Sequence, residues 1–217
     1  MTYIDRLIIS KDWITLLLVG CVVLYALAKF LYPRRFQEFV LLPITNKYFL
    51  VQGRNDLIQL PFNILLFATQ TISISLFIYL ALEAWQPAMV AENPWIFVQI
   101  LTIFTVFVLI KFFIEKIISS VFAIDGLVHG YLYHKLTYRN LISMFFFIAN
   151  IVFFYAFQPS KIILLIFITI MVLANLISLF YSYKTYAKII FKDFFYFILY
   201  LCALEISPYI ILYKMMV

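Results

Sequence analysis

The chain has 217 residues, of which 66% are apolar, 20% are aromatic and only 12% are charged, and its formal net charge is +6. This composition excludes a soluble globular domain, a disordered tail and a disulfide scaffold. A transmembrane helix needs about 20 apolar residues, so the length allows about six or seven crossings and leaves no room for a separate soluble domain. We therefore expect a single membrane domain over residues 1–217.

Six apolar runs are long enough to cross a bilayer, at about 13–32, 61–85, 95–113, 141–157, 162–181 and 194–213. The runs are continuous rather than alternating, which predicts helices rather than the strands of a barrel. No small-residue cleavage site follows the first run, so we expect it to be a retained helix and not a signal peptide. The predicted fold is an all-α, polytopic bundle of six transmembrane helices.

The basic residues predict the orientation, because Lys and Arg near span ends are retained on the cytoplasmic side. Twelve of them fall on one set of loops, and four fall on the other set: Arg6, Lys11, Lys161 and Lys214. This bias places both termini on the periplasmic side, which only an even number of spans allows. Trp13, Trp85 and Trp95 lie at the predicted outer interface, where indoles are enriched.

The first predicted cytoplasmic segment, 33–60, is amphipathic. Phe36 and Phe39 alternate there with Arg34, Arg35 and other polar side chains, a pattern typical of an interfacial amphipathic helix. Two roles remain open for the segment. It either covers the cytoplasmic end of the bundle or forms a docking surface for a partner.

The second cytoplasmic segment is predicted to continue the third helix to Phe122 and to turn near Asp125 and Gly126. Glu115 follows Lys111 by four residues, which predicts an ion pair on the helix surface.

The stretch 125–140 contains both histidines and is rich in tyrosine. Asp125 and His129 share a helix face, as a metal pair would. His129 and His134 do not share one, and no third ligand is close in sequence, so a tyrosine-rich interfacial helix is the favoured interpretation. Asp125, His129, His134 and Arg139 are retained as a candidate cytoplasmic interface.

Several polar residues fall inside the predicted spans, where an ionisable group is costly. Glu205 lies about 16 Å into the sixth span at 1.5 Å per residue, and Pro208 frees the carbonyl of Leu204 from its helix bond. Asn150 is near the middle of the fourth span, Asn175 is on the inner half of the fifth, and Gln70 belongs to a polar band on the second. The candidate intramembrane site is therefore Glu205, Pro208, Asn150, Asn175 and Gln70.

Three interpretations of these polar residues remain open. They join helices by hydrogen bonds, or Glu205 forms a proton or cation site with Asn150 and Gln70, or a partner subunit meets Glu205 from outside.

The chain resembles a Bacteroidota family of integral membrane proteins classed as a domain of unknown function. The resemblance rests on these stretches: Leu41–Phe49, Pro61–Asn63, Ile110–Lys116, Tyr138–Asn140 and the final run with Ala203–Tyr209. It covers essentially the whole chain and implies a protein of the inner membrane in a bacterium with a two-membrane envelope. It implies no activity, and the Glu205 region is its most distinctive part.

Three functions fit these observations. The first is a non-enzymatic accessory or scaffold subunit of an inner-membrane complex, such as envelope protein export or assembly machinery. The second is a small transporter, channel or lipid-handling protein that uses Glu205. The third is a membrane-embedded enzyme, which ranks last because no recognised catalytic spacing occurs.

We expect no cofactor, because the sequence contains no nucleotide or metal motif. The expected partners are the lipid bilayer and other membrane subunits. Nucleic acid is excluded because no basic extension is long enough to bind it.

Overall fold

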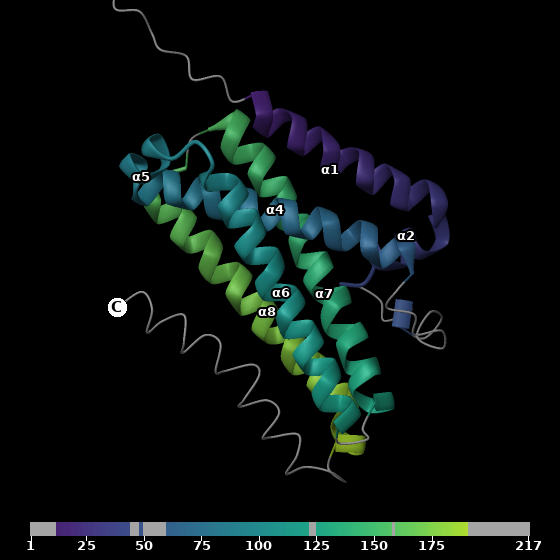
Figure 1. Ribbon diagram of the computed structural model, residues 1–217. Helices are drawn as coiled ribbons and strands as arrows, with labels where there is room; N and C mark the ends of the chain where they lie inside the picture. Colours follow the sequence, from purple (N-terminus) through teal and green to yellow (C-terminus); the bar gives the residue numbers. More distant parts are fainter. Residues whose placement is uncertain (1–11, 44–47, 50–59, 122–124, 158, 191–217) are drawn as a thin grey trace, which may run out of the picture.

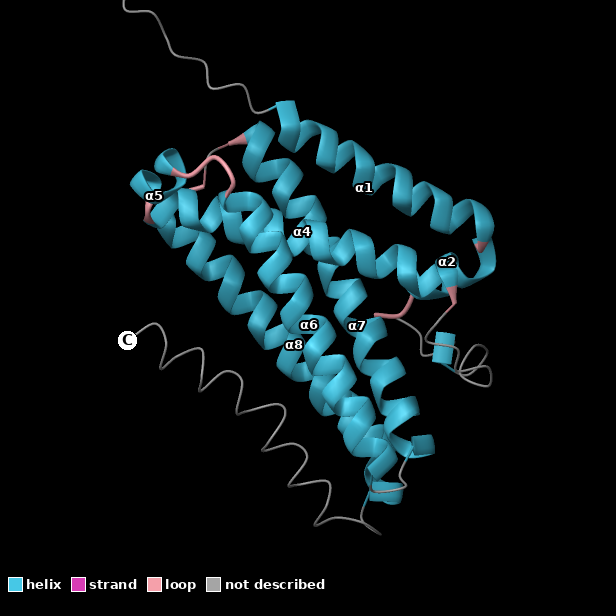
Figure 2. Cartoon of the chain, in the orientation of Figure 1, coloured by secondary structure: helices cyan, strands magenta, loops and turns pink. Residues whose placement is uncertain are grey.

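The computed structural model describes residues 12–43, 48–49, 60–121, 125–157 and 159–190. These residues form helices joined by short turns and contain no strand, which confirms the all-α class (Figure 2). In chain order the elements are α1 (Asp12–Leu31), α2 (Pro33–Val40), α4 (Pro61–Trp85), α5 (Pro87–Glu92), α6 (Ile96–Val121), α7 (Asp125–Ile151), the π-helix η2 (Val152–Ala156) and α8 (Lys161–Ile190).

Five of the described helices are long and apolar enough to cross a membrane. They are α1, α4, α6, the stretch Gly130–Ala156 of α7 and η2, and the stretch Lys161–Ser182 of α8. Each corresponds to one of the first five predicted runs. The sixth run, 194–213, lies outside the described residues, and so do Glu205 and Pro208.

Prolines mark where several helices begin. Pro33, Pro61 and Pro87 occupy the first positions of α2, α4 and α5. The missing N–H of proline costs little there, and its fixed φ suits the first helical turn. The amphipathic helix expected after the first span is α2, whose Phe39 is buried.

Helix α7 is longer than the sequence predicted. An interfacial helix over 125–140 and a span over 141–157 were expected, but residues 125–151 form one continuous helix. The reason is local: no glycine or proline occurs from Tyr131 to Phe157, so nothing interrupts the backbone hydrogen bonds. The third helix also continues to Val121, as the sequence predicted.

Helix α4 is the centre of the bundle, because it contacts α1, α6, α7 and α8. Helix α1 lies along α4, while α6, α7 and α8 run across it, and α7 contacts both α6 and α8 (Figure 1). One face of α1 is buried, and the spacing of its residues is helical: Ile14, Leu18, Cys21 and Ala28.

Aromatic rings fill much of the interior. The ring of Phe167 on α8 lies 5.2 Å from Phe77, 5.5 Å from Phe146 and 5.7 Å from Phe153. Trp13 lies 4.9 Å from Phe97 and thereby brings the starts of α1 and α6 together. These edge-on and tilted contacts join helices that are distant in sequence.

Candidate functional site

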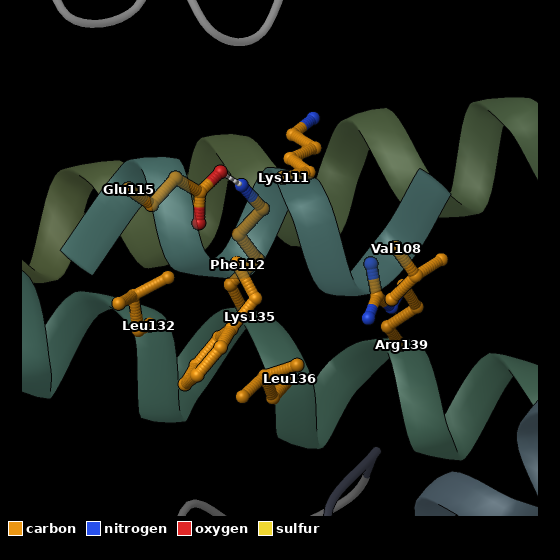
Figure 3. Close-up of a pocket in the computed structure, with 8 residues that line it drawn as sticks. All are labelled: Val108, Lys111, Phe112, Glu115, Leu132, Lys135, Leu136 and Arg139. Carbon is orange, nitrogen blue, oxygen red and sulfur yellow. Dashed lines mark hydrogen bonds and ion pairs between the residues drawn. The ribbon is translucent and has the colours of Figure 1, made fainter. Parts of the chain in front are cut away.

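A small pocket lies between α6 and α7 (Figure 3). We call it the α6–α7 pocket; its lining is Val108, Lys111, Phe112, Glu115, Leu132, Lys135, Leu136 and Arg139. The side chains converge because α6 and α7 run in opposite directions and each contributes residues spaced three or four apart. The pocket is partly open and has a volume of about 10 Å³, which is room for about one water molecule.

A buried ion pair crosses this pocket. The Lys135 Nζ donates a hydrogen bond of 2.7 Å to Glu115 Oε1, and the two side chains are 10% and 3% exposed. Lys135 Nζ also lies 5.7 Å from the centre of the Tyr131 ring. The expected surface position of Glu115 is therefore wrong, since this carboxylate faces α7 in the interior.

Arg139 extends from α7 toward α6, one turn along the helix from Lys135 (Figure 3). Lys111 stands one turn before Glu115 on α6 and points away from α7 in this view. The pocket lining therefore has three basic side chains and one acidic side chain, a local surplus of positive charge.

Tyr48 and Phe49, which follow α2 in the chain, pack against α7. The Tyr133 hydroxyl donates to the Tyr48 hydroxyl at 3.0 Å, and the two rings are nearly parallel. Burial, more than the neighbouring Tyr133, raises the pKa of the Tyr48 phenol above its ordinary value. Tyr48 and Phe39 also belong to one buried cluster with Phe62 of α4. These contacts favour the covering role for this segment over a free docking surface.

His134 is a packing residue in this arrangement. Its ring stacks on Phe49 with centroids 3.6 Å apart, and the residue is 7% exposed. Asp125 and His129 belong to α7, but their side chains lie outside the described part of the structure. Among the described residues, no group of three or more His, Cys, Asp or Glu side chains could hold a metal ion.

The second candidate region is a buried polar core between α4 and α7. Four of its residues are fully buried: Gln70, Ser73, Ser75 and Asn150. Asn150 Nδ2 donates to the backbone oxygen of Ser73 at 2.7 Å, which joins the two helices directly. Asn175 lies half-buried on α8. Sequence reasoning singled out Asn150 and Gln70, and the structure buries both.

Several polar atoms of this core have no hydrogen-bond partner among the described residues, namely Ser73 Oγ, Ser75 Oγ, Asn150 Oδ1 and both polar atoms of the Gln70 amide. The threonines of the polar bands behave differently, since Thr69, Thr71 and Thr105 each donate to a carbonyl of their own helix. Such hydroxyls are satisfied locally and do not line a polar path.

Sequence reasoning missed the pairing of Glu115 with Lys135. The available signal was the four-residue spacing of Lys111 with Glu115 and of Lys135 with Arg139, which puts each pair on one face of its helix. Spacing within a helix does not reveal which residue of the neighbouring helix lies opposite.

A family model described as "Domain of unknown function (DUF4271)" matches residues 14–216. The chain belongs to this family. The DUF4271 match covers the five described helices that are long and apolar enough to cross a membrane, apart from the first two residues of α1, and also the sequence positions of Glu205 and Pro208. It confirms the resemblance to a family of unknown function. No curated protein and no solved structure matches the chain.

Proposed function

We propose that this DUF4271 protein is a non-enzymatic accessory or scaffold subunit of a bacterial inner-membrane complex, such as envelope protein export or assembly machinery. The observation that carries the proposal is the closed polar core. Gln70, Ser73, Ser75 and Asn150 are all 0% exposed, so no surface of these side chains is open to water. A transport path needs polar groups that a solute can reach, whereas the Asn150 bond to Ser73 serves to join helices.

The outward faces of the bundle supply the surface that a subunit needs. On α8 these residues include Ile162, Leu165, Ile177 and Phe180, each more than half exposed. The same apolar faces suit lipid and the helices of a neighbouring membrane protein.

The proposed location is the inner membrane of a member of the Bacteroidota, with both termini in the periplasm. The positive-inside bias of the loops supports the orientation. The contact between Trp13 and Phe97 also supports this orientation. Because Trp95 is two residues before Phe97, the contact brings Trp13 and Trp95 to the same end of the bundle, as expected for tryptophans of one interface.

The test is purification of the tagged protein at native expression level in mild detergent, followed by mass spectrometry and size determination. We expect a stoichiometric membrane protein to accompany the chain, and to be absent when an unrelated tagged membrane protein of similar size is purified in parallel. A clean monomer without a partner would overturn the proposal.

A second candidate function is a small transporter, channel or lipid-handling protein that uses Glu205. The observation that favours it is the Gln70 amide, because a buried amide without a hydrogen bond is costly and calls for a further polar partner. Glu205→Gln distinguishes the two. Loss of activity with normal folding supports a transport site, whereas a parallel loss of folding supports a structural role. An enzyme remains the third candidate, and the covering of His134 by Phe49 counts against its use of that histidine.

A further inference from the structure

Helix α2 lies at a definite depth if α1 crosses a bilayer. The 20 residues of α1 span about 30 Å at 1.5 Å per residue, which is the thickness of the hydrocarbon core. Since α2 begins at Pro33, directly after α1, it lies where hydrocarbon meets the headgroups. Figure 1 shows α2 at the end of α4 that is away from α5, and α5 follows Trp85. Helix α2 is therefore at the interface opposite the predicted tryptophan interface.

Three cations lie close together in the chain at this level. Lys29 is in the last turn of α1, and Arg34 and Arg35 are in the first turn of α2. We call these three residues the α1–α2 junction. Glu38 is the one acidic residue of α2, and no described carboxylate pairs with any of the three cations. The junction therefore presents a surplus of positive charge at headgroup depth.

Arg35 is in an unusual position for a cation, because it lies on the inward face of α2. It precedes the fully buried Phe39 by four residues, and its Nη1 nitrogen is enclosed without a hydrogen-bond partner among the described residues. Its charge is close enough to Tyr48 to oppose the rise in the phenol pKa that burial causes. A guanidinium that loses water on one side without a counter-ion is costly, so this position favours a bound anion. The side chain as a whole is only partly buried, which leaves its other nitrogens open to an anion from the surface.

The surroundings of the junction favour a lipid over a free ion. The outward face of α1 that leads to it is apolar: Val23 is 51% exposed, Leu27 42% and Phe30 82%. Basic residues bordered by such a face at headgroup depth attract anionic lipid. An arginine fork binds two oxygens of a phosphate, and an acyl chain of the same molecule would cover the apolar face.

We propose that the α1–α2 junction binds the phosphate of an anionic phospholipid. Arg35 is the main binding residue, Arg34 and Lys29 add positive charge, and an acyl chain lies along the outward face of α1. This site goes beyond the proposed scaffold role. Its test needs no partner protein, so the failure of either proposal leaves the other standing.

The test measures lipid binding to the purified full-length chain in neutral detergent. Native mass spectrometry and the thermal shift are recorded on adding phosphatidylglycerol, cardiolipin or phosphatidylcholine. We expect the anionic lipids to bind and stabilise the chain and phosphatidylcholine to bind at least about tenfold more weakly, a difference of about 1.4 kcal/mol. Equal binding of phosphatidylcholine would overturn the proposal.

The variant Arg35→Gln should lose about tenfold of the anionic-lipid affinity. The matched control is Lys116→Gln, which removes the same charge from an exposed position near the end of α6 and should keep its affinity within about twofold. Equal losses in the two variants would overturn the proposal, because they would show attraction by total charge and no defined site. An unchanged affinity in Arg35→Gln would overturn it as well.

Stability without lipid separates a binding role of Arg35 from a structural one. Without added lipid, Arg35→Gln should melt at about the temperature of the parent chain, because the charge that it removes has no counter-ion. The difference should appear only with anionic lipid. An equal fall in melting temperature with and without lipid would show a structural role and overturn the proposal.

Two further measurements complete the test. Inorganic phosphate at millimolar concentration should neither stabilise the chain nor displace the lipid; if it does either, the site takes free phosphate and the lipid assignment is wrong. Arg35→Lys keeps the charge but not the fork, so we expect an intermediate affinity. If Arg35→Gln fails to fold, an unchanged affinity in Arg35→Lys would overturn the proposal.

Discussion

At the scale of single residues, the buried ion pair between Lys135 and Glu115 has the largest expected effect on stability. Glu115→Gln leaves the Lys135 ammonium buried beside a neutral amide. Breaking a buried pair on one side costs about 3–5 kcal/mol because the remaining charge is desolvated without compensation. We expect a loss of stability of about this size, measured by denaturant unfolding in detergent.

Replacing both members of the pair tests the same assignment. The double variant Glu115→Leu with Lys135→Met removes both charges and keeps apolar volume, so it should recover most of the stability that Glu115→Gln loses. A double variant no more stable than Glu115→Gln would contradict the assignment of the pair as a buried contact.

A pH dependence is expected from Tyr48. Burial raises the pKa of its phenol, so the folded chain holds this proton more tightly than the unfolded chain does. The contribution to stability is therefore complete below pH of about 10, the ordinary tyrosine pKa, and is lost as the pH rises above it.

Tyr48→Phe should lose about 1 kcal/mol at neutral pH, because the hydrogen bond from Tyr133 disappears. It should also lose stability less steeply above pH of about 10 than the parent chain does. Melting temperatures between neutral and strongly alkaline pH measure both effects, and an unchanged alkaline slope would contradict the burial of this phenol.

The polar core gives a comparison of two buried amides. Asn150→Leu removes the bond to Ser73 and should destabilise the bundle by about 0.6 kcal/mol or somewhat more. Gln70→Leu removes an amide that has no hydrogen bond among the described residues, so it should be neutral or stabilising. A large loss of stability in Gln70→Leu would show that the amide bonds to a group outside the described residues.

The sequence predicts which polar residues are buried better than it predicts their partners. The burial of Asn150 and Gln70 could be predicted, because a polar residue inside a lipid-spanning helix must turn inward. The partner of Glu115 could not, because it depends on how α6 and α7 are aligned with each other, and that alignment has no signal in either helix alone.

At the scale of elements, helix α8 depends on few aromatic contacts. Phe167 is its main anchor, since this ring meets Phe77, Phe146 and Phe153. Phe167→Ala should cost about 3 kcal/mol or more, and the amides of α8 should then exchange hydrogen faster while those of α4 change little. The outward-facing Phe180→Ala is the control, because that side chain is 68% exposed and its loss leaves no cavity.

The elements were predictable in number and type for the first five spans, but their ends were less so. Hydrophobicity marks the part of a helix that lies in lipid, whereas a helix continues until a residue or a turn breaks it. The polar start of α7, with Lys135 and Arg139, therefore escaped prediction as part of the same helix as Asn150.

At the scale of the whole molecule, the proposed orientation can be tested with single cysteines in a chain where Cys21 and Cys202 are replaced by alanine. Met89→Cys on α5 and Val121→Cys at the end of α6 introduce thiols at sites that are 52% and 73% exposed. With both termini in the periplasm, a membrane-impermeant maleimide added to spheroplasts should label position 89 and should label position 121 only after permeabilisation. The reverse pattern would contradict the proposed orientation.

Burial and apolarity are inversely related across the five described spans. The most buried helices, α4 and α7, are the least apolar, while α8 has only 6% of its span buried and is the most apolar. Polar side chains are therefore concentrated in the helices that other helices cover.

This relation also bears on how the chain enters the membrane during its synthesis. Helix α4 emerges after α1, and α7 emerges after α6; in each case the less apolar helix follows a more apolar one that it contacts in the finished bundle. The more apolar helix is stable in lipid by itself, and the less apolar helix can pack against it as soon as it is inserted. The order of the helices along the chain is therefore also a favourable order of insertion.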